Sequence, residues 1–271
     1  MAHETYTHGH HESVLRSHRW RTAENSAAYL LPHLSPGMDL LDVGCGPGTI
    51  TLDLAERVAP GRVRGIDASA DVIAAAVASA STDRATGTTA EVEFSVGNAY
   101  ALDAADSSVD VVHAHQVLQH LADPVAALAE WRRVVKPDGL VAARDADYAA
   151  FTWYPSAPLL DRWLVLYEAA ARANGGEPDA GRRLLSWANR AGFSDVTGSG
   201  TVWCFANPAD RSWWGGLWAD RISKSALATQ LVAENLASAD ELEAIAGAWR
   251  SWADEPDGWF IVPNGEILAR G

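Results

Sequence analysis

The most constraining feature of this sequence is a glycine-rich turn between a short apolar run and a helical segment. The run at 39–43 (DLLDV) is typical of a strand buried in a parallel sheet. Glycines follow at positions 44, 46 and 48, and residues 50–58 continue with helical spacing. Glycine permits positive φ angles and a close approach of the backbone to a ligand, and the N–H groups at the start of the next helix can hold polar or negatively charged atoms. By itself, the turn predicts a nucleotide-like ligand.

The spacing of the glycines distinguishes two kinds of nucleotide-like ligand. A nicotinamide-dinucleotide site prefers G-x-G-x-x-G, which would place glycine at position 49. This sequence has Thr49 there and glycine at position 48, and it lacks an obvious Tyr-x-x-x-Lys pair. The spacing therefore departs from the dinucleotide fingerprint and favours S-adenosylmethionine.

The rest of the sequence alternates predicted strands with predicted helices. Strands are expected at 62–66, 92–96, 109–115, 140–143, 196–205 and 259–268, and helices at 13–34, 70–81, 124–135, 159–173, 182–191 and over much of 209–252. Within the first helical segment, Thr22 to Asn25 resembles a second helix start. Such alternation indicates a doubly wound sheet. We therefore expect an α/β, Rossmann-like fold with a mostly parallel seven-stranded sheet, an N-terminal helical leader and a helical lid.

Three regions are expected within a single compact domain. Residues 1–37 form the helical leader, residues 38–145 the cofactor-binding core, and residues 146–271 the closing strands with a helical insertion that binds the acceptor. Ten of the twelve tryptophans lie from Trp153 onward, so the second half differs in kind from the first.

The candidate cofactor residues follow four predicted strands. Right-handed crossovers place the carboxyl ends of parallel strands at one edge of the sheet. A carboxylate at Asp67 can accept hydrogen bonds from two ribose hydroxyls, and Asn98 can read an adenine edge through its amide. His115 ends the fourth strand, next to where the methyl group would lie, whereas His113 alternates to the other side and is interpreted as structural. The full set of candidates in the core is Gly44, Cys45, Gly46, Asp67, Ala68, Asn98, Ala99, His115 and Gln116.

Each of these residues also has an ordinary structural explanation. Asp67 is compatible with a surface-turn aspartate, Asn98-Ala99 is a common turn, and His115 is compatible with a hydrogen-bonded strand-end histidine. Agreement among four separate loops is what favours the cofactor site.

Composition narrows the range of partners. A formal charge of −14 and a pI near 4.9 argue against nucleic acid and against an anionic membrane surface, and no apolar run approaches the ~20 residues of a membrane span. The two cysteines, Cys45 and Cys204, make a disulfide framework unexpected. With no signal-peptide pattern, a cytoplasmic protein is expected. The histidines at 3, 8, 10, 11 and 18 lack a companion ligand cluster, so no metal site is expected.

Four segments together resemble class I S-adenosylmethionine-dependent methyltransferases of the UbiE-like group. They are LLDVGCGPGTITLDLA, GIDAS, GNAYAL and HAHQVLQHLADPVAALAEWRRVVKPDGLV, and the resemblance covers roughly residues 38–145. It implies S-adenosylmethionine as cofactor, S-adenosylhomocysteine as product, and contacts at Gly44, Gly46, Asp67, Asn98, Ala99 and His115. Asn98 replaces the aspartate that many relatives have near adenine. His115 stands where relatives have a small polar residue, so their acceptor chemistry does not carry over.

A second resemblance covers more of the chain. The leader YTHGHHESVLRSHRWRTAENSAAYLLPHL and the tryptophan-rich tail are similar to those of microbial natural-product methyltransferases, including enzymes that methylate thiols. In such proteins the leader helix lies over the cofactor. The resemblance makes Tyr6, His18 and Arg21 candidates for this lid, with Arg21 near the cofactor carboxylate or, alternatively, in a surface ion pair.

The expected function is methyl transfer from S-adenosylmethionine to a small molecule, with S- or O-methylation of a secondary metabolite favoured. The alternatives are C-methylation of a quinone precursor and a non-catalytic S-adenosylmethionine-binding protein. A thiol or phenol acceptor needs a base, for which His115 is the first candidate, followed by Tyr148 or Asp145. Tyr148, Trp153 and Trp214 are expected to bind an aromatic or apolar acceptor, although tryptophans in the tail can equally fill the core of the lid. The oligomeric state is left open.

Overall fold

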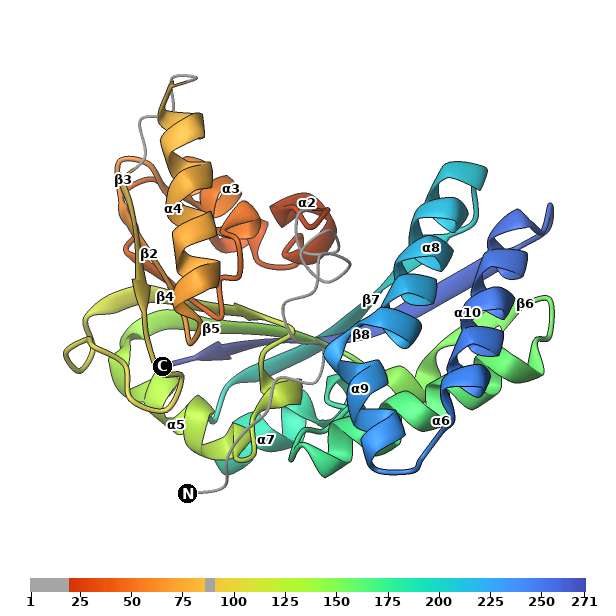
Figure 1. Cartoon of the computed structure of the whole chain (residues 1–271). Helices are drawn as coiled ribbons and strands as arrows, with labels where there is room; N and C mark the ends of the chain where they lie inside the picture. The colour runs from red at the N-terminus through yellow and green to blue at the C-terminus, as the bar shows by residue number, and fades with distance from the viewer. Residues whose placement is uncertain (1–19, 86–90) are drawn as a thin grey trace.

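A single β-sheet runs through the molecule, with helices packed at both of its ends and against its middle (Figure 1). The computed structural model describes residues 20–85 and 91–271. The strands are β1 (Leu40–Val43), β2 (Arg62–Asp67), β3 (Glu91–Val96), β4 (Val109–His115), β5 (Val135–Ala146), β6 (Thr152–Tyr154), β7 (Val196–Phe205) and β8 (Trp259–Arg270). Their order is β3-β2-β1-β4-β5-β8-β6, with β7 also paired to β8. The predicted α/β, Rossmann-like architecture is confirmed.

Strands β1 to β5 are parallel, and the last three strands pair antiparallel. The sheet has eight strands instead of the expected seven, because the short β6 was not anticipated. The hydrogen-bond register explains the difference. Strand β8 pairs with β5 through residues 264–270 and with β6 through residues 259–261, whereas β7 pairs with residues 260–269. Strand β6 therefore continues the line of β5 along one side of β8.

The helices pack at the two ends of the sheet and also against its middle strands. Their bounds are α2 (Ala23–Ser26), α3 (Thr49–Val58), α4 (Ala70–Ala85), α5 (Pro124–Val134), α6 (Pro158–Ala173), α7 (Leu184–Arg190), α8 (Pro208–Lys224), α9 (Ala226–Ala233) and α10 (Ala239–Asp254). Figure 1 shows α8 and α10 side by side near β7 and β8, whereas α3 and α4 lie at the end formed by β2 and β3. The predicted helical insertion after β7 thus consists of three helices.

The expected helix over 13–34 is wrong in its described part. Thr22 does cap a helix through a capping box with Asn25, but α2 ends after one turn at Ser26, and a 3-10 helix follows at Leu31–His33. Pro32 cannot donate the N–H bond of an α-helix that runs through it, so a continuous helix to 34 is disfavoured, although α2 already ends well before the proline. Ala27 and Leu30 are nonetheless fully buried, so the apolar residues serve packing and not a helical face.

The tryptophan-rich half forms its own aromatic core between α6, α8, α10 and strands β7 and β8. Trp163 on α6 is fully buried and makes edge-to-face contacts with Trp218 at 4.5 Å and with Trp249 at 4.8 Å between ring centroids. Edge-to-face pairs at these distances are favourable beyond the area they bury. The aromatic rings therefore hold the helical insertion onto the closing strands.

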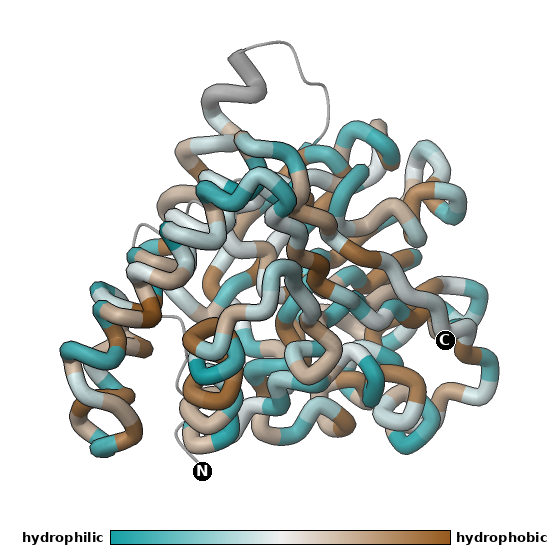
Figure 2. Tube along the Cα trace, turned by 90° about the vertical axis from the view of Figure 1, so that its right-hand side faces the viewer, coloured by the Kyte–Doolittle hydropathy of each residue, from teal (hydrophilic) through white to brown (hydrophobic). Residues whose placement is uncertain are grey.

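Hydrophobic and hydrophilic residues are interleaved along the helices (Figure 2). None of the helices within the described residues is long and apolar enough to cross a membrane.

Replacing Trp163 with alanine tests the importance of the aromatic core. We expect Trp163→Ala to lower the free energy of unfolding by about 3–5 kcal/mol, because the change empties a large, fully buried site. Urea denaturation measures the loss. Trp259→Ala is the control, since that indole is 38% exposed and should cost much less. Equal losses in the two variants would contradict the assignment of the core.

Candidate functional site

A cavity of about 570 Å³ opens at the carboxyl ends of β1, β2, β3 and β4. Its volume falls within the range of pockets that hold cofactor-sized ligands. The lining includes ten of the eleven residues expected to contact the cofactor, namely Arg21, Gly44, Cys45, Gly46, Asp67, Ala68, Asn98, Ala99, His115 and Gln116. The eleventh, Tyr6, and the lid candidate His18 lie outside the described residues. The parallel sheet thus brings four loops to one place, as the strand pattern predicted.

The glycine-rich turn is tied to the end of the neighbouring strand β2. Gly44 and Cys45 both donate their N–H groups to the carbonyl of Ile66, at 2.7 and 2.9 Å. Gly46 donates to Asp67 Oδ2 at 3.2 Å, and Gly48 donates back to the carbonyl of Cys45 at 3.1 Å. These N–H groups already have partners within the protein. The turn itself therefore supplies a closely approachable surface, and the N–H groups at the start of α3 stay the predicted donors.

Two positions in the turn require glycine for steric reasons. Gly44 has a φ of +69°, and a Cβ there would overlap Val117 Cγ2. Gly48 has a φ of +86°, and a Cβ there would lie 2.7 Å from Phe94 Cζ. A side chain at either site would meet both a backbone penalty and a collision.

Asp67 lies at the end of β2, where the structure fixes its carboxylate from two sides. Oδ2 accepts the N–H of Gly46, and Oδ1 accepts the N–H of Ser69 at 3.0 Å. The side chain is held in place at the cavity wall, and each carboxylate oxygen keeps a further lone pair for a ligand.

Beneath the turn, a buried network supports the end of β1. Asp42 is 2% exposed; its Oδ2 accepts the hydroxyl of Thr51 at 2.5 Å, and its Oδ1 pairs with His113 Nδ1 at 2.7 Å. This contact supports a structural role for His113, but the expected alternation between His113 and His115 is wrong, because residues two apart along a strand face the same side. Asp42 also lines the cavity, and it was missed as a site residue although it directly precedes the turn in the sequence.

At the end of β4, His115 and Gln116 face the cavity from adjacent positions. His115 is 5% exposed, and its ring lies 5.6 Å from that of Trp203 on β7. Gln116 has a φ of +54°, and its N–H is held by the carbonyl of Arg144 on β5 at 2.7 Å. Its Oε1 accepts a hydrogen bond from Arg21 Nη2 at 2.5 Å. The structure therefore ties the N-terminal segment to the end of β4.

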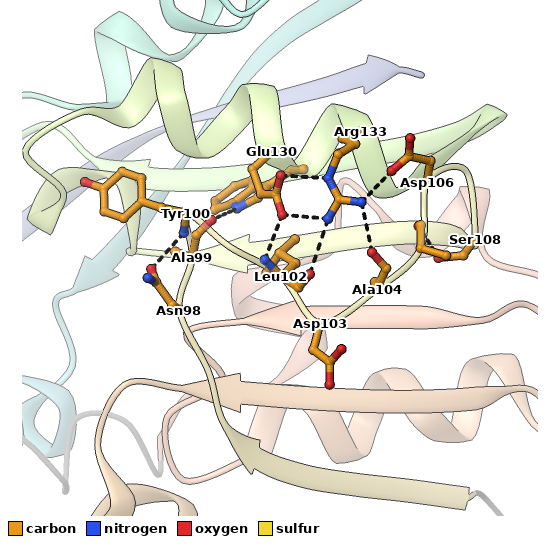
Figure 3. A network of polar contacts seen from close by, with 12 residues as sticks. Asn98, Ala99, Tyr100, Leu102, Asp103, Ala104, Asp106, Ser108, Glu130 and Arg133 are labelled. Carbon is orange, nitrogen blue, oxygen red and sulfur yellow. Dashed lines mark hydrogen bonds and ion pairs between the residues drawn. The ribbon is translucent and has the colours of Figure 1, made fainter.

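Asn98 and Ala99 line the cavity at the start of an irregular segment between β3 and β4. Asn98 Oδ1 accepts the N–H of Tyr100 at 2.9 Å, which fixes the side chain in a local turn. Contacts from Glu130 and Arg133 on α5 hold the remainder of this segment (Figure 3). Tyr100 also lines the cavity and was not anticipated.

Two buried titratable groups lie near the ends of β4 and β5. Burial lowers the pKa of His120, which lines the cavity, to about 3, so its imidazole is neutral near pH 7. Burial raises the pKa of Asp145 to about 7. Asp145 Oδ1 accepts the N–H of Gln119 at 3.1 Å, whereas Oδ2 has no hydrogen-bond partner in the described part of the chain. The carboxyl oxygen without a partner is consistent with a protonated group.

The three residues expected to bind the acceptor lie in the aromatic core and not in the cavity lining. Tyr148 is stacked between Phe151 and Tyr167, at 4.4 and 4.1 Å. Trp214 is stacked on Phe205 at 4.3 Å, and Trp153 on Phe260 at 5.5 Å. Burial raises the pKa of Tyr148, which keeps the phenol protonated and disfavours it as a base. Their role toward an acceptor stays a prediction.

Within residues 20–85 and 91–271, no group of three or more histidine, cysteine, aspartate or glutamate side chains could hold a metal ion. The histidines at 3, 8, 10, 11 and 18 lie outside those ranges. Burial raises the pKa of the Cys45 thiol, which stays protonated beside the turn.

Comparisons with known proteins point to one family. Residues 41–143 match the family model described as a methyltransferase domain. An uncharacterized methyltransferase of Schizosaccharomyces pombe is 34% identical over 97% of this chain and 95% of its own length, and the probable methyltransferase ltbC of Aspergillus luteorubrus is 30% identical over 97% and 96%. A phosphoethanolamine methyltransferase of Haemonchus contortus, solved with phosphomonomethylethanolamine and S-adenosylhomocysteine, shares the fold with a TM-score of 0.56 at 16% identity; the match covers 91% of this chain and 52% of that one.

Substitution of Gly44 tests the steric requirement of the turn. We expect Gly44→Ala to lower the free energy of unfolding by about 1–3 kcal/mol, because alanine must adopt a positive φ against Val117. The matched control is Gly216→Ala on α8, where a Cβ meets nothing within 4 Å and should stabilise the helix by about 0.5–1 kcal/mol. Urea denaturation compares the two, and equal stability would refute the steric argument.

The pH dependence of stability tests the state of Asp145. Its pKa is about 7 in the folded protein and about 3.9 in an unfolded chain, so the folded state binds more protons between those values. This stabilising contribution is complete below about pH 4 and is lost as the pH rises through 7. Since asparagine does not titrate, the unfolding free energy of Asp145→Asn should improve relative to wild type from pH 4 to 7 and then level off. Urea denaturation across this range measures the difference.

Asp138→Asn, at an exposed position of β5, is the control and should show no such trend. A difference between Asp145→Asn and wild type that is constant with pH would contradict the raised pKa of Asp145.

Proposed function

The chain belongs to the class I S-adenosylmethionine-dependent methyltransferases, and from this we propose that it methylates a small metabolite at sulfur or oxygen. S-adenosylmethionine is the methyl donor of this family, and a small molecule is the acceptor. The observation that carries the proposal is the cavity, at which loops from four strands and Arg21 converge. The residues of that cavity fit the donor.

The polar groups around the cavity match the successive parts of the donor. We assign the adenine to Asn98 and Ala99, and the ribose hydroxyls to the carboxylate of Asp67. Gly44 and Gly46 let the methionine part pass close to the backbone, since neither has a Cβ. Cys45 and Ala68 complete the walls of these subsites. The assignment follows the order of the strands β3, β2, β1 and β4 across the sheet.

Arg21 is proposed to bind the donor carboxylate. Its guanidinium reaches the cavity and is oriented by its hydrogen bond to Gln116. It also lies 5.7 Å from the ring centroid of Trp203, which positions it from a second side. This geometry supports the lid interpretation of Arg21 over a surface ion pair.

For methyl transfer, the protein mainly has to position the donor and the acceptor and to exclude water. The donor supplies an activated methyl group on a sulfonium, and transfer is an in-line displacement by the acceptor. His115 is proposed to take the proton of a thiol or phenol acceptor, since its buried imidazole faces the cavity beside Gln116. Asp145, with a pKa of about 7, is the second candidate for this role.

The side chains next to His115 favour an uncharged acceptor. The neutral His120 and the apolar Val117 and Leu121 complete this part of the lining. Arg21 is paired with the donor carboxylate in this assignment, so its charge is not left to select the acceptor. The apolar side chains suit an aromatic or apolar acceptor.

The turnover experiment uses the full chain with S-adenosylmethionine and separate panels of aromatic thiols, phenols, quinone precursors and phosphoethanolamine. Formation of S-adenosylhomocysteine is the readout. Turnover confined to thiols or phenols supports the proposal. Turnover of quinone precursors or amines alone would overturn the preference for sulfur and oxygen, and donor binding without turnover on any panel would favour a non-catalytic role.

Removal of the Asp67 carboxylate tests the ribose assignment. We expect Asp67→Ala to weaken binding of S-adenosylhomocysteine by ~10-fold or more, because two charge-assisted hydrogen bonds to ribose are lost. Isothermal titration calorimetry measures the affinity. Asp71→Ala, an exposed aspartate in the first turn of α4, is the control and should bind as wild type does. Unchanged affinity in Asp67→Ala would place the ribose elsewhere.

A further inference from the structure

An unusual connection joins β3 to β4. These two strands are parallel but not adjacent, since β2 and β1 lie between them in the sheet. Parallel strands are usually connected by a crossover that contains a helix, but residues 97–108 contain no helix, and one isolated bridge pairs Asn98 with Ala101. Leu102 from this segment is nonetheless buried in the same core as α5. A segment without regular structure must find partners for its backbone polar groups elsewhere.

Helix α5 supplies partners for several of these backbone groups, and the residue that caps it also contacts the Tyr100 side chain. At the start of α5, the N–H of its capping residue Asp123 donates to Tyr100 Oη at 3.1 Å. In its middle, the indole N–H of Trp131 donates to the carbonyl of Ala99 at 3.0 Å. At its end, the carbonyl groups of Arg133 and Val134 accept the N–H groups of Ser107 and Ser108, at 2.9 and 2.8 Å.

The pair formed by Glu130 and Arg133 makes the most extensive of these contacts (Figure 3). Glu130 Oε1 accepts the N–H of Leu102 at 2.7 Å and is itself held by Arg133 Nη2 at 2.7 Å. Arg133 Nη1 donates to the carbonyl of Ala104 at 2.9 Å and to Asp106 Oδ1 at 2.6 Å. One charged pair therefore fixes both an N–H and a carbonyl group of the segment. Such charge-assisted contacts are stronger than neutral ones.

We propose that Trp131, Glu130 and Arg133 are positioning residues for the adenine end of the donor. The proposal rests on the proposed function, in which Asn98 and Ala99 contact the adenine. Trp131 acts closest to that contact, because it holds the carbonyl of Ala99 while the other face of the segment lines the cavity. Glu130 and Arg133 hold the residues that follow, so that the turn at Asn98 keeps one conformation before the donor binds. Preorganisation of this kind removes an ordering cost from binding.

The central variant is Trp131→Phe, which keeps most of the buried aromatic volume and removes the N–H donor. We expect it to weaken binding of S-adenosylhomocysteine about three- to ten-fold. The truncated probe 5′-methylthioadenosine should lose affinity by the same factor, because the lost contact acts at the adenine end that both probes share. Hydrogen exchange should speed up at the amides of 98–104 and stay unchanged at the glycine-rich turn.

A second variant, Arg133→Gln, tests the same positioning role at a partly exposed side chain that tolerates replacement. We again expect a loss of about three- to ten-fold for both probes. The matched controls are Trp187→Phe, in the same hydrophobic core on α7, and Arg132→Gln, on the adjacent exposed position where the guanidinium packs on Phe193. Both controls should bind the probes as wild type does.

The outcomes separate the two proposals. If wild type fails to bind S-adenosylhomocysteine, the proposed function fails. If wild type binds it and the two variants bind as their controls do, the positioning role is overturned while the function stands. A loss of affinity for S-adenosylhomocysteine without a loss for 5′-methylthioadenosine also overturns it, because the effect would then arise at the methionine end.

Discussion

The two hydrogen bonds that Gly44 and Cys45 donate to the carbonyl of Ile66 are the constraint on which the rest of the site depends. They hold the turn after β1 against the end of β2 and so bring the backbone within reach of Asp67, which the turn contacts through Gly46. That arrangement needs glycine at position 44, where a side chain would meet Val117 from the loop after β4. Three loops from three adjacent strands are thereby locked together before any ligand binds.

Much of the fold could be predicted from the sequence, because its signals are local. Buried parallel strands appear as short apolar runs, and the predicted bounds of 109–115 and 196–205 match β4 and β7. The N-terminal segment shows where such reasoning fails. Ala27 and Leu30 have helical spacing, yet α2 ends at Ser26, and tertiary burial determines the apolar pattern instead. The short β6 could not be foreseen, since three residues carry no periodicity.

The candidate site likewise has one part that could be predicted from the sequence and one part that could not. Its cofactor loops follow from topology alone, since each candidate directly follows a parallel strand. The acceptor residues do not, because an aromatic side chain gives the same signal whether it lines a cavity or fills a core. Tyr148 and Trp214 are packed against other rings of the aromatic core, whereas His120 and Leu121, which were not singled out as site candidates, line the cavity. The contacts of Trp131 with the segment after β3 likewise depend on three-dimensional packing and have no counterpart in local sequence.

A crystal structure of the full chain with S-adenosylhomocysteine tests the central claim most directly. The account predicts the ribose hydroxyls within hydrogen-bond distance of the Asp67 carboxylate, the adenine against Asn98 and Ala99, and the sulfur facing His115. A ligand bound outside this cavity, or inside it with the ribose away from Asp67, would contradict the claim that the glycine-rich turn and its neighbouring loops form the donor site.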